Sequence, residues 1–473
     1  MTTRCTRIGS CLVGMAAVVG WVWIPPGAQA DTLRGALTQA YQNNPQLNAQ
    51  RAAVRATDES VPQALSGYRP RISLSASAGE AYSDTTTRAV AANGTVTYPR
   101  TIGSNAVQTY GATYSQRLLD GFGTASRTRQ AEQQVSAARE TLRLTEQAVL
   151  LAAATAYMNL IRDAAILALQ RSNVEVLQEQ LRQTQDRFRI GEVTRTDVAQ
   201  SESRLASGRS TLLQAESNYV TSKATYRQVV GVEPGKLEAA APVDRLSPSN
   251  LQAAIQSARA THPSVTTAMF SIDAAQFQVK IAESSLYPTL DAVASVQKSY
   301  GSQVQPSTLE TFTASGVAQL NIPIYQGGGE YATIRAAKET LQQRRVDLDT
   351  ARDQAQQTLV QSWGQLEAAK AQILATQQQV TAAEIALNGV REEALVGQRT
   401  TLDVLNAQQE LVNARVALVT AQRDRVVASY TLLGSAGRLS VQVLQLPVQV
   451  YDPTVHYHQV RDTWIGVRTP DGK

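Results

Sequence analysis

Cysteine and histidine are almost absent from this chain. Its 473 residues contain two cysteines, Cys5 and Cys11, and three histidines. Both cysteines fall in a segment that we expect to be removed, which leaves no thiol for a disulfide, a metal site or a nucleophile. His456-x-His458 has the spacing of a metal-ligand pair, but no compact acidic cluster accompanies it. We therefore expect no catalytic site, no metal and no cofactor.

A strong charge of one sign is also missing. The chain carries 44 Lys and Arg residues against 39 Asp and Glu residues, a net charge of +5. Removal of an N-terminal segment that contains Arg4 and Arg7 would leave +3, since 5 − 2 = 3. A balance this small and this dispersed gives no reason to expect a nucleic-acid partner.

The one long apolar run lies at the N-terminus. It extends from Cys11 to Ile24, follows two arginines and precedes the small-x-small sequence Ala28-Gln29-Ala30. This order predicts a secretory signal peptide over residues 1–30, cut before Asp31. The mature chain is therefore expected to be exported.

No later apolar run reaches the roughly 18 residues of a transmembrane helix. The nearest is Ala148 to Ile161, which is interrupted by Thr155, Tyr157 and Asn159. We interpret this run as a core or bundle helix. Any membrane span of the mature chain would then have to consist of strands.

Glycine and proline are missing from two long stretches of equal length. Thr124 to Ile190 contains neither, and Glu330 to Val396 contains only Gly364 and Gly389. Each stretch has 67 residues, enough for a helix of about 100 Å. Apolar residues recur at 4-3 spacing, for example from Ala131 to Ala156, which predicts left-handed supercoiling against neighbouring helices. A simple coiled-coil rod remains an alternative.

One sequence pattern occurs twice along the chain. Tyr68-x-Pro70 recurs as Tyr287-Pro288, and Gly191-x-x-Thr194-x-x-Asp197 recurs as Gly397-x-x-Thr400-x-x-Asp403. The offset falls from 218 to 206 positions, which we attribute to a longer loop between residues 82 and 107. We divide the chain into a signal peptide (1–30), a first repeat (31–240), a second repeat (241–440) and a C-terminal equatorial or periplasmic tail (441–473).

Each repeat is expected to begin and end with helices. Helices are predicted over residues 33–65 and 251–286, and they run into Pro70 and Pro288, where a helix cannot easily continue. At Gly191 and Gly397 the long helices turn and return over residues 194–230 and 400–433. The Thr-x-x-Asp sequence after each turn is a capping box that restarts a helix.

After each proline the apolar period changes to two, which predicts strands of about 10 to 14 residues with one apolar face. A water-exposed sheet would show the same alternation. Four strands cannot close a barrel, and open edges cannot lie in lipid. Three chains would give twelve strands and room for a lumen. The apolar positions include Ile72, Leu74, Ala76, Ala78, Tyr110, Ala112, Tyr114, Leu290, Ala292, Ala294 and Val296.

Glycines mark both junctions from strand to helix. Gly327-Gly328-Gly329 with Ala332 imitates a dinucleotide-binding fingerprint, but no second parallel strand follows it. Gly121-x-Gly123 occupies the same place in the first repeat. We interpret both as flexible joints.

The sequence resembles the TolC family of outer-membrane channel-tunnels over residues 33 to about 439. The most specific segments are Pro323-Ile-Tyr-Gln-Gly-Gly-Gly329 and Gly397-x-Arg399-Thr-x-x-Asp403-Val-Leu405. The tail from Tyr451-Asp-Pro453 to Arg468-Thr-Pro470 is similar to that of members serving type I secretion.

The resemblance implies an α+β membrane protein: a homotrimer whose twelve-stranded barrel lies in outer-membrane lipid and continues as a helical tunnel through the periplasm. It implies a passive exit duct of a type I secretion or efflux system, with no enzymatic activity. The partners would be a periplasmic adaptor and an inner-membrane ABC or proton-driven pump. A multidrug efflux outlet is the alternative to protein secretion. A periplasmic adaptor or a coiled-coil scaffold is a more distant alternative.

The resemblance also implies a gate at the periplasmic tip. Asp403 would form one ring of the constriction, with Arg399, Thr196 and Asp197 in the network that restrains the hairpins. Asn406 stands where many members have a second aspartate, and Ala394 replaces a tyrosine. The turns at Gly191 and Gly397 would be where the adaptor docks. Helix capping alone is the alternative role of Asp197 and Asp403.

Overall fold

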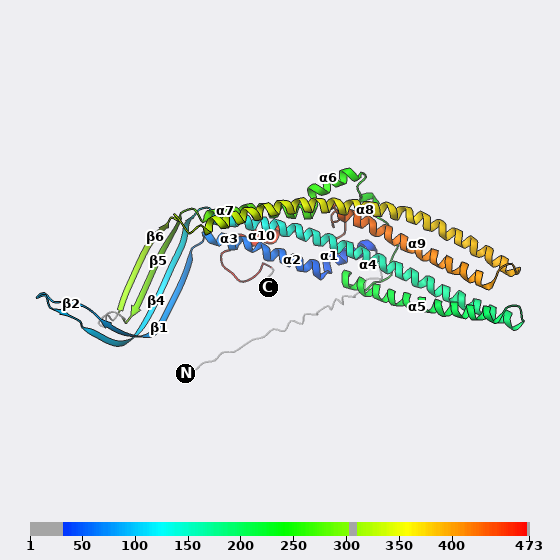
Figure 1. Ribbon diagram of the computed structural model, residues 1–473, viewed down its shortest axis with the longest axis horizontal. Helices are drawn as coiled ribbons and strands as arrows, with labels where there is room; N and C mark the ends of the chain where they lie inside the picture. The colour runs from blue at the N-terminus through cyan, green and yellow to red at the C-terminus, as the bar shows by residue number, and fades with distance from the viewer. Residues whose placement is uncertain (1–31, 302–309, 471–473) are drawn as a thin grey trace, which may run out of the picture.

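The computed structural model describes residues 32–301 and 310–470, so the expected signal peptide lies outside the described residues. The strands lie at one end of an elongated molecule, and the helices fill the rest (Figure 1).

Two helices of 67 residues form the length of the molecule. They are α4 (Gly123–Arg189) and α8 (Gly329–Leu395). Each returns as a shorter antiparallel helix, α5 (Arg195–Val230) or α9 (Thr401–Ser435). The two predicted helical hairpins are confirmed, with bounds within two residues of those expected.

The helix expected at the start of each repeat is broken, contrary to the prediction of continuous helices over 33–65 and 251–286. Proline disfavours helical backbone at the residue before it but suits the first helical position. Asn44 and His262 therefore end one helix and cap the next: Asn44 Oδ1 accepts from the Gln46 amide at 2.9 Å, and His262 Nδ1 from the Ser264 amide at 3.2 Å. The resulting elements are α1 (Leu33–Asn43), α2 (Pro45–Asp58), α3 (Ser60–Leu65) and η1 (Ser66–Tyr68), then η2 (Asp244–Leu246), α6 (Leu251–Thr261) and α7 (Pro263–Ser284).

Four antiparallel strands form one sheet in the order β1-β4-β5-β6. The second repeat supplies β5 (Thr289–Tyr300) and β6 (Glu310–Asn321), which have the expected length. The first supplies β1 (Arg71–Thr86) and β4 (Arg100–Asp120), of 16 and 21 residues. A small hairpin of β2 (Ala89–Val90) and β3 (Val96–Thr97) lies between them.

The long loop expected over residues 82–107 is therefore mostly strand. Tyr82 pairs with Ser104, and the pairing continues to Thr86 and Arg100. The guanidinium of Arg100 and the carboxylate of Asp84 form an ion pair across these strands. This part of the sheet lacks a regular apolar face, so its sequence reads as a loop although its backbone is paired.

The strand register separates the two faces of the sheet. Pairing aligns apolar residues across all four strands, and the next row along consists of hydroxyl side chains. Ser295 Oγ lies 2.9 Å from Ser315 Oγ in that polar row. The alternation predicted from sequence is thus a real division of faces. The apolar row is Ile72, Tyr114, Ala294 and Gly316, and the polar row is Ser73, Thr113, Ser295 and Ser315.

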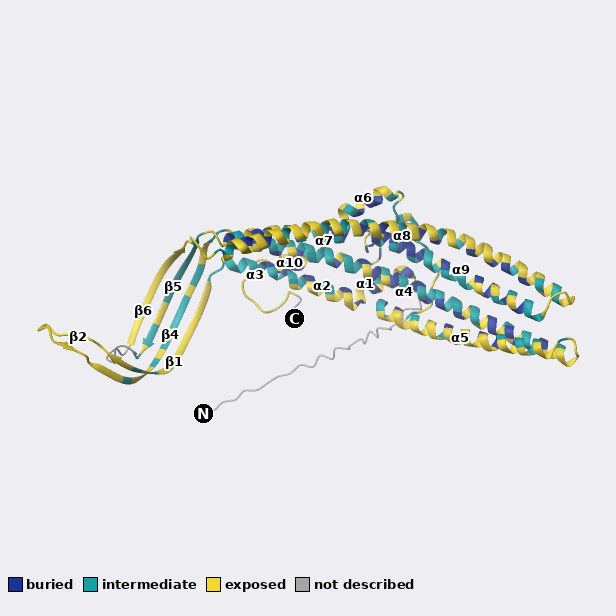
Figure 2. Ribbon diagram, viewed as in Figure 1, coloured by how far each residue is buried: buried dark blue, intermediate teal, exposed yellow. Residues whose placement is uncertain are grey.

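The main core lies in the middle of the helical part, where Figure 2 shows most of the buried positions. Within Ala148–Ile161, Leu150, Tyr157 and Leu160 are fully buried. They pack with residues of α1 and α9 and with Leu439 and Val441. Among the described residues, α4 alone has the length and composition of a membrane span, and half of its most apolar window is buried. The interpretation of this run as a core helix is confirmed.

The junction glycines of the two repeats are not equivalent. Gly121 has φ +60°, and a Cβ there would lie 2.5 Å from Tyr287 Cβ and 3.0 Å from the Ser284 oxygen. Gly327 and Gly328 also have positive φ, but no atom lies within 4 Å of their Cβ positions. The first junction is therefore a close-packed turn, and the prediction of a flexible joint is wrong there.

Gly121→Ala should destabilise the protein. The left-handed backbone costs a Cβ-bearing residue about 1–2 kcal/mol, and overpacking adds about 1–3 kcal/mol. Gly329→Ala is the matched control, because Gly329 lacks positive φ and has open space at its Cβ. The measurements are the folded yield and the temperature of unfolding. Equal values for the two variants would contradict the close-packed turn.

Candidate gate at the tips of the helical hairpins

The two hairpin turns lie together at the end of the molecule farthest from the sheet (Figure 1). Gly191 and Gly397 both have φ +79°, with no atom within 4 Å of the position of a Cβ. Glycine is therefore required at these turns by backbone conformation and not by lack of space.

Each return helix begins with a complete capping box. In the first hairpin, Asp197 Oδ2 accepts from the Thr194 amide at 2.9 Å, and Thr194 Oγ1 accepts from the Asp197 amide at 3.3 Å. Thr400 and Asp403 make the same two bonds at 3.0 and 3.2 Å. The capping predicted from Thr-x-x-Asp is confirmed.

The capping bonds keep both carboxylates charged. The side-chain and backbone hydrogen bonds from Thr194 lower the pKa of Asp197, and the backbone and side-chain bonds from Thr400 lower the pKa of Asp403. Each tip therefore carries a carboxylate that stays ionised at neutral pH.

A hollow of about 300 Å³ lies between the two tips. It is lined by Asp197 from the first hairpin and by Ala394, Gly397 and Arg399 from the second. Thr196 and Asn406 are exposed and, like Asp403, lie outside this lining. The structure thus brings only some of the expected gate residues together within one chain.

Arg399 has a partner that the sequence did not indicate. Its Nε lies 2.8 Å from Glu393 Oε2 across the turn. The bond to Glu393 is the main cause that raises the pKa of Arg399, and the charge of Asp403 contributes less. In the first hairpin, Arg187 and Glu192 pair across Gly191 at 2.6 Å. In both hairpins, an acidic and a basic residue lie on either side of the turn glycine, and this pattern could have predicted the two ion pairs.

The two hairpins are joined through Asn406. Its Oδ1 accepts from Arg204 Nη2 on α5 at 2.7 Å. One residue earlier, Leu405 packs into a cluster of the first hairpin with Val174, Leu177 and Leu205. Arg204 lies between the repeated motifs, so nothing in the sequence pattern marked it.

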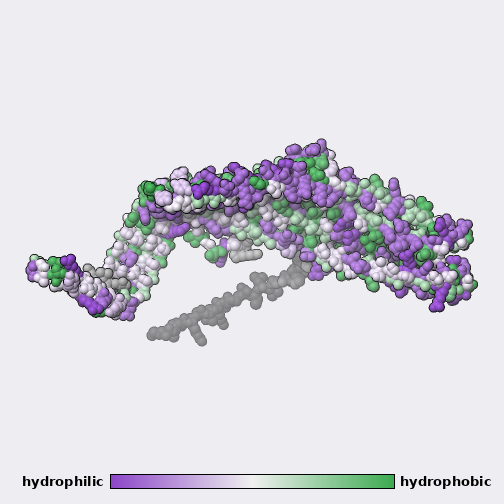
Figure 3. Space-filling view, viewed as in Figure 1, coloured by the Kyte–Doolittle hydropathy of each residue, from purple (hydrophilic) through white to green (hydrophobic). Residues whose placement is uncertain are grey.

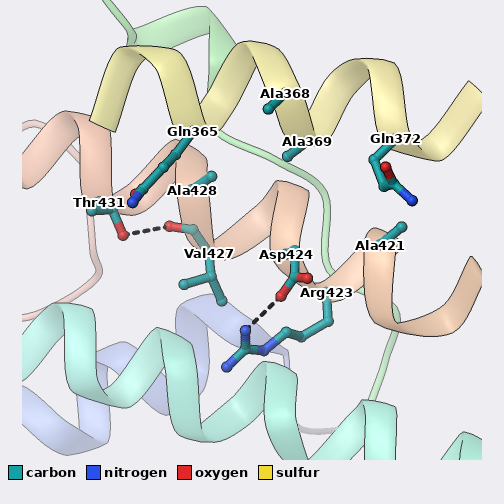
Figure 4. Close-up of a pocket in the computed structure, with 10 residues that line it drawn as sticks. All are labelled: Gln365, Ala368, Ala369, Gln372, Ala421, Arg423, Asp424, Val427, Ala428 and Thr431. Atoms are coloured by element: carbon teal, nitrogen blue, oxygen red, sulfur yellow. Dashed lines mark hydrogen bonds and ion pairs between the residues drawn. The ribbon is translucent and has the colours of Figure 1, made fainter. Parts of the chain in front are cut away.

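A second hollow, of about 410 Å³, lies between α8 and α9 (Figure 4). Ala368, Ala369 and Ala421 line it with Gln365, so small side chains let the helices approach. Arg423 reaches Asn159 of α4 at 2.7 Å and Asp424 at 2.6 Å. The ten lining residues contain no nucleophile with a neighbouring base, and this hollow reflects helix packing.

The two C-terminal histidines have different neighbours. His456, on α10 (Thr454–Val460), is buried with Nδ1 3.0 Å from Asp58 Oδ2. Burial raises the pKa of Asp58. The ring of His458 lies edge-on to Tyr457 with centroids 5.4 Å apart. His456 therefore attaches the tail to α2.

Residues 36–232 and 254–438 match a family model described as outer membrane efflux protein. The chain belongs to this family. The outer membrane efflux protein BepC of Brucella suis is 41% identical over 99% of this chain and all of its own length. The outer membrane protein TolC of Escherichia coli is 28% identical over 88% of this chain and 84% of its own. The solved Campylobacter jejuni CmeC outer membrane channel has a TM-score of 0.73 at 16% identity and covers 91% of this chain and 89% of its own.

The family and the fold confirm the resemblance to TolC. The chain is an outer membrane channel protein. The two matched segments correspond to the two repeats.

Proposed function

We propose that three copies of this chain form the passive exit duct of a tripartite efflux system. The observation that carries the proposal is the pair of open edges, β1 and β6, on a sheet continuous with two 67-residue helices. Unpaired edges are costly in lipid, so the sheet requires partners.

Three copies satisfy both edges of every sheet with twelve strands. The helices support the same closure, because α2, α4, α7 and α8 lie beside one another in the order of the strands that they join. Closing the barrel then also closes the helices into a tunnel.

A duct performs no chemistry, so the energy must come from partners. The partner classes that fit are an inner-membrane ABC or proton-driven pump and a periplasmic adaptor that docks at the turns of Gly191 and Gly397. The identity of 41% to a protein named for efflux favours efflux as the activity. The likeness of the Tyr451–Pro470 tail to type I secretion members favours protein export as the second candidate.

The gate would lie at the hairpin tips. In a trimer, three Asp403 carboxylates near the axis would repel one another unless cations or arginines offset their charge. Arg204–Asn406 and the Leu405 cluster hold the two hairpins of one chain together. Opening would therefore move hairpins as pairs or break these contacts.

The assembly is tested by extraction of the outer-membrane fraction in mild detergent. We expect detergent-resistant, heat-modifiable trimers that form channels in planar bilayers. A monodisperse monomer that conducts ions would show that the barrel closes without three chains.

Export is tested in cells lacking the chain. Loss of small-molecule efflux, restored by the chain with its pump and adaptor, is the expected result. Restoration of protein secretion alone would favour the second candidate.

The lipid-facing side of the barrel is tested by a pair of adjacent substitutions. Ala294→Arg should impair insertion, because a charge on the lipid side near the midplane costs about 2–4 kcal/mol. Ser295→Arg, on the polar row, should be tolerated. The measurement is the trimer yield in outer membranes. A defect in Ser295→Arg alone would mean that the two faces are reversed, and equal defects would contradict the division into a lipid-facing and a polar face.

The gate is tested by removing one charge while keeping the cap. Asp403→Asn retains an oxygen that can accept from the Thr400 amide, but it removes the anionic ring. Because Asn406 supplies no second ring, cation selectivity and block by multivalent cations should largely disappear in single-channel recordings. Arg399→Ser should raise conductance by releasing Glu393.

Asp197→Asn is the matched control for Asp403→Asn, since Asp197 makes the same capping bonds in the first hairpin. It should leave most of the cation block in place. If Asp403→Asn keeps the cation selectivity and the block by multivalent cations, Asp403 acts as a helix cap and not as part of the gate.

A further inference from the structure

The C-terminal tail is firmly attached to the helices beside the sheet. The bond of His456 to Asp58 fixes α10 on α2. Tyr457 packs against a cluster that includes Val61 and Val135. Arg461 Nη2 reaches Glu132 Oε1 of α4 at 3.8 Å. The residues that follow α10 therefore start from a defined place.

The attachment continues to the foot of β1. Arg69, two residues before the strand, donates from Nη1 to the Thr463 oxygen at 2.7 Å. Its guanidinium carbon lies 4.8 Å from the ring centroid of Trp464. The tail is thus held beside the edge strand at the level where the sheet meets the helices.

This attached segment nevertheless presents large apolar side chains to solvent. Trp464 is 66% exposed, Ile465 94% and Val467 100%. The loop is coloured as exposed throughout in Figure 2. Three large apolar side chains are thus exposed within the four positions 464–467. Exposed apolar side chains grouped in this way are characteristic of an interaction surface.

A second exposed apolar group lies at the opposite edge of the sheet. It follows the end of β6 and consists of Ile322, Ile324 and Tyr325, which are 53%, 87% and 78% exposed. Figure 3 shows hydrophobic atoms gathered at this junction of strands and helices.

Strand direction brings the two groups to the same level. β1 starts at the helical end of the sheet with Arg71, and β6 finishes there with Asn321. If β1 of one copy pairs with β6 of the next, the pairing is antiparallel and sets the first residues of β1 beside the last residues of β6. Arg69 and the attached tail then face the segment that follows Asn321.

We propose that the tail is an intersubunit clasp in which Trp464, Ile465 and Val467 pack on Ile322, Ile324 and Tyr325 of the neighbouring copy. The proposal rests on the trimer proposed above and adds a contact outside the barrel strands. A second copy is the occupant because each group lies at one of the two edges that closure brings together.

The clasp is tested by cross-linking in the assembled full chain. Ile465→Cys combined with Ile324→Cys should give covalent trimers with a short bis-maleimide, since the sequence has no cysteine after Cys11. Arg71→Cys combined with Asn321→Cys is the control pair, because it reports pairing of β1 with β6 without the tail.

The two pairs separate the two proposals. Linkage of both supports the clasp. Linkage of the control pair alone overturns the clasp and leaves the trimer standing. Linkage of neither overturns the trimer and the clasp together.

A variant and a spectroscopic measurement test the energetic role and the other occupant. Trp464→Ala should speed thermal dissociation of the trimer about tenfold, as for an aromatic interface anchor, whereas Val455→Ala on α10 should not. In Trp363→Phe, Trp464 is the one tryptophan after residue 30, and brominated lipids should quench it little. Strong quenching without cross-linking would place the tail in the membrane interface and overturn the clasp.

Discussion

The rest of this structure depends on the hydrogen-bonding groups at the two edges of its four-stranded sheet. The outer sides of β1 and β6 have no strand partner within the described chain, and lipid offers no hydrogen bonds to replace one. A soluble protein could leave such edges to water. An outer-membrane protein must pair them with another chain, and the order of the strands then determines the order of the helices below.

The same requirement explains why so much apolar surface is exposed in a single chain. Ile72, Leu74 and Phe312 are exposed on the strands, and the long helices are buried mainly along the faces that contact neighbours in the same chain. Within the described residues, the largest buried cluster is formed by the middle of α4 with α1, α9 and Leu439. In the proposed trimer, the single chain would be one part of a closed wall, with its largest core where several layers of helix meet.

The period of the apolar residues and the positions of glycine, proline and capping residues predicted most of the fold. The lack of glycine and proline gave both 67-residue helices, and Thr-x-x-Asp gave both caps, because these signals are local. Full helix breaks at Asn44 and His262 were not predicted although each residue precedes a proline. The pairing of Tyr82–Thr86 with Arg100–Ser104 was missed because these side chains show no apolar alternation. The partner Arg204 depends on how the two hairpins pack, which no local pattern encodes, whereas the acid and base on either side of Gly397 were a local signal for the pairing of Glu393 with Arg399. The close approach of Gly121 to Tyr287 depends likewise on tertiary packing.

The equal length of α4 and α8 has a consequence for how such a duct changes in size. Both helices span about 100 Å, so both hairpins end level, with Arg204 opposite Asn406. Loss of one heptad from a single repeat would displace its tip by about 10 Å along the axis and separate these residues. A change in the length of the proposed duct would therefore have to occur in both repeats together, so the internal duplication keeps the two helical hairpins equal in length.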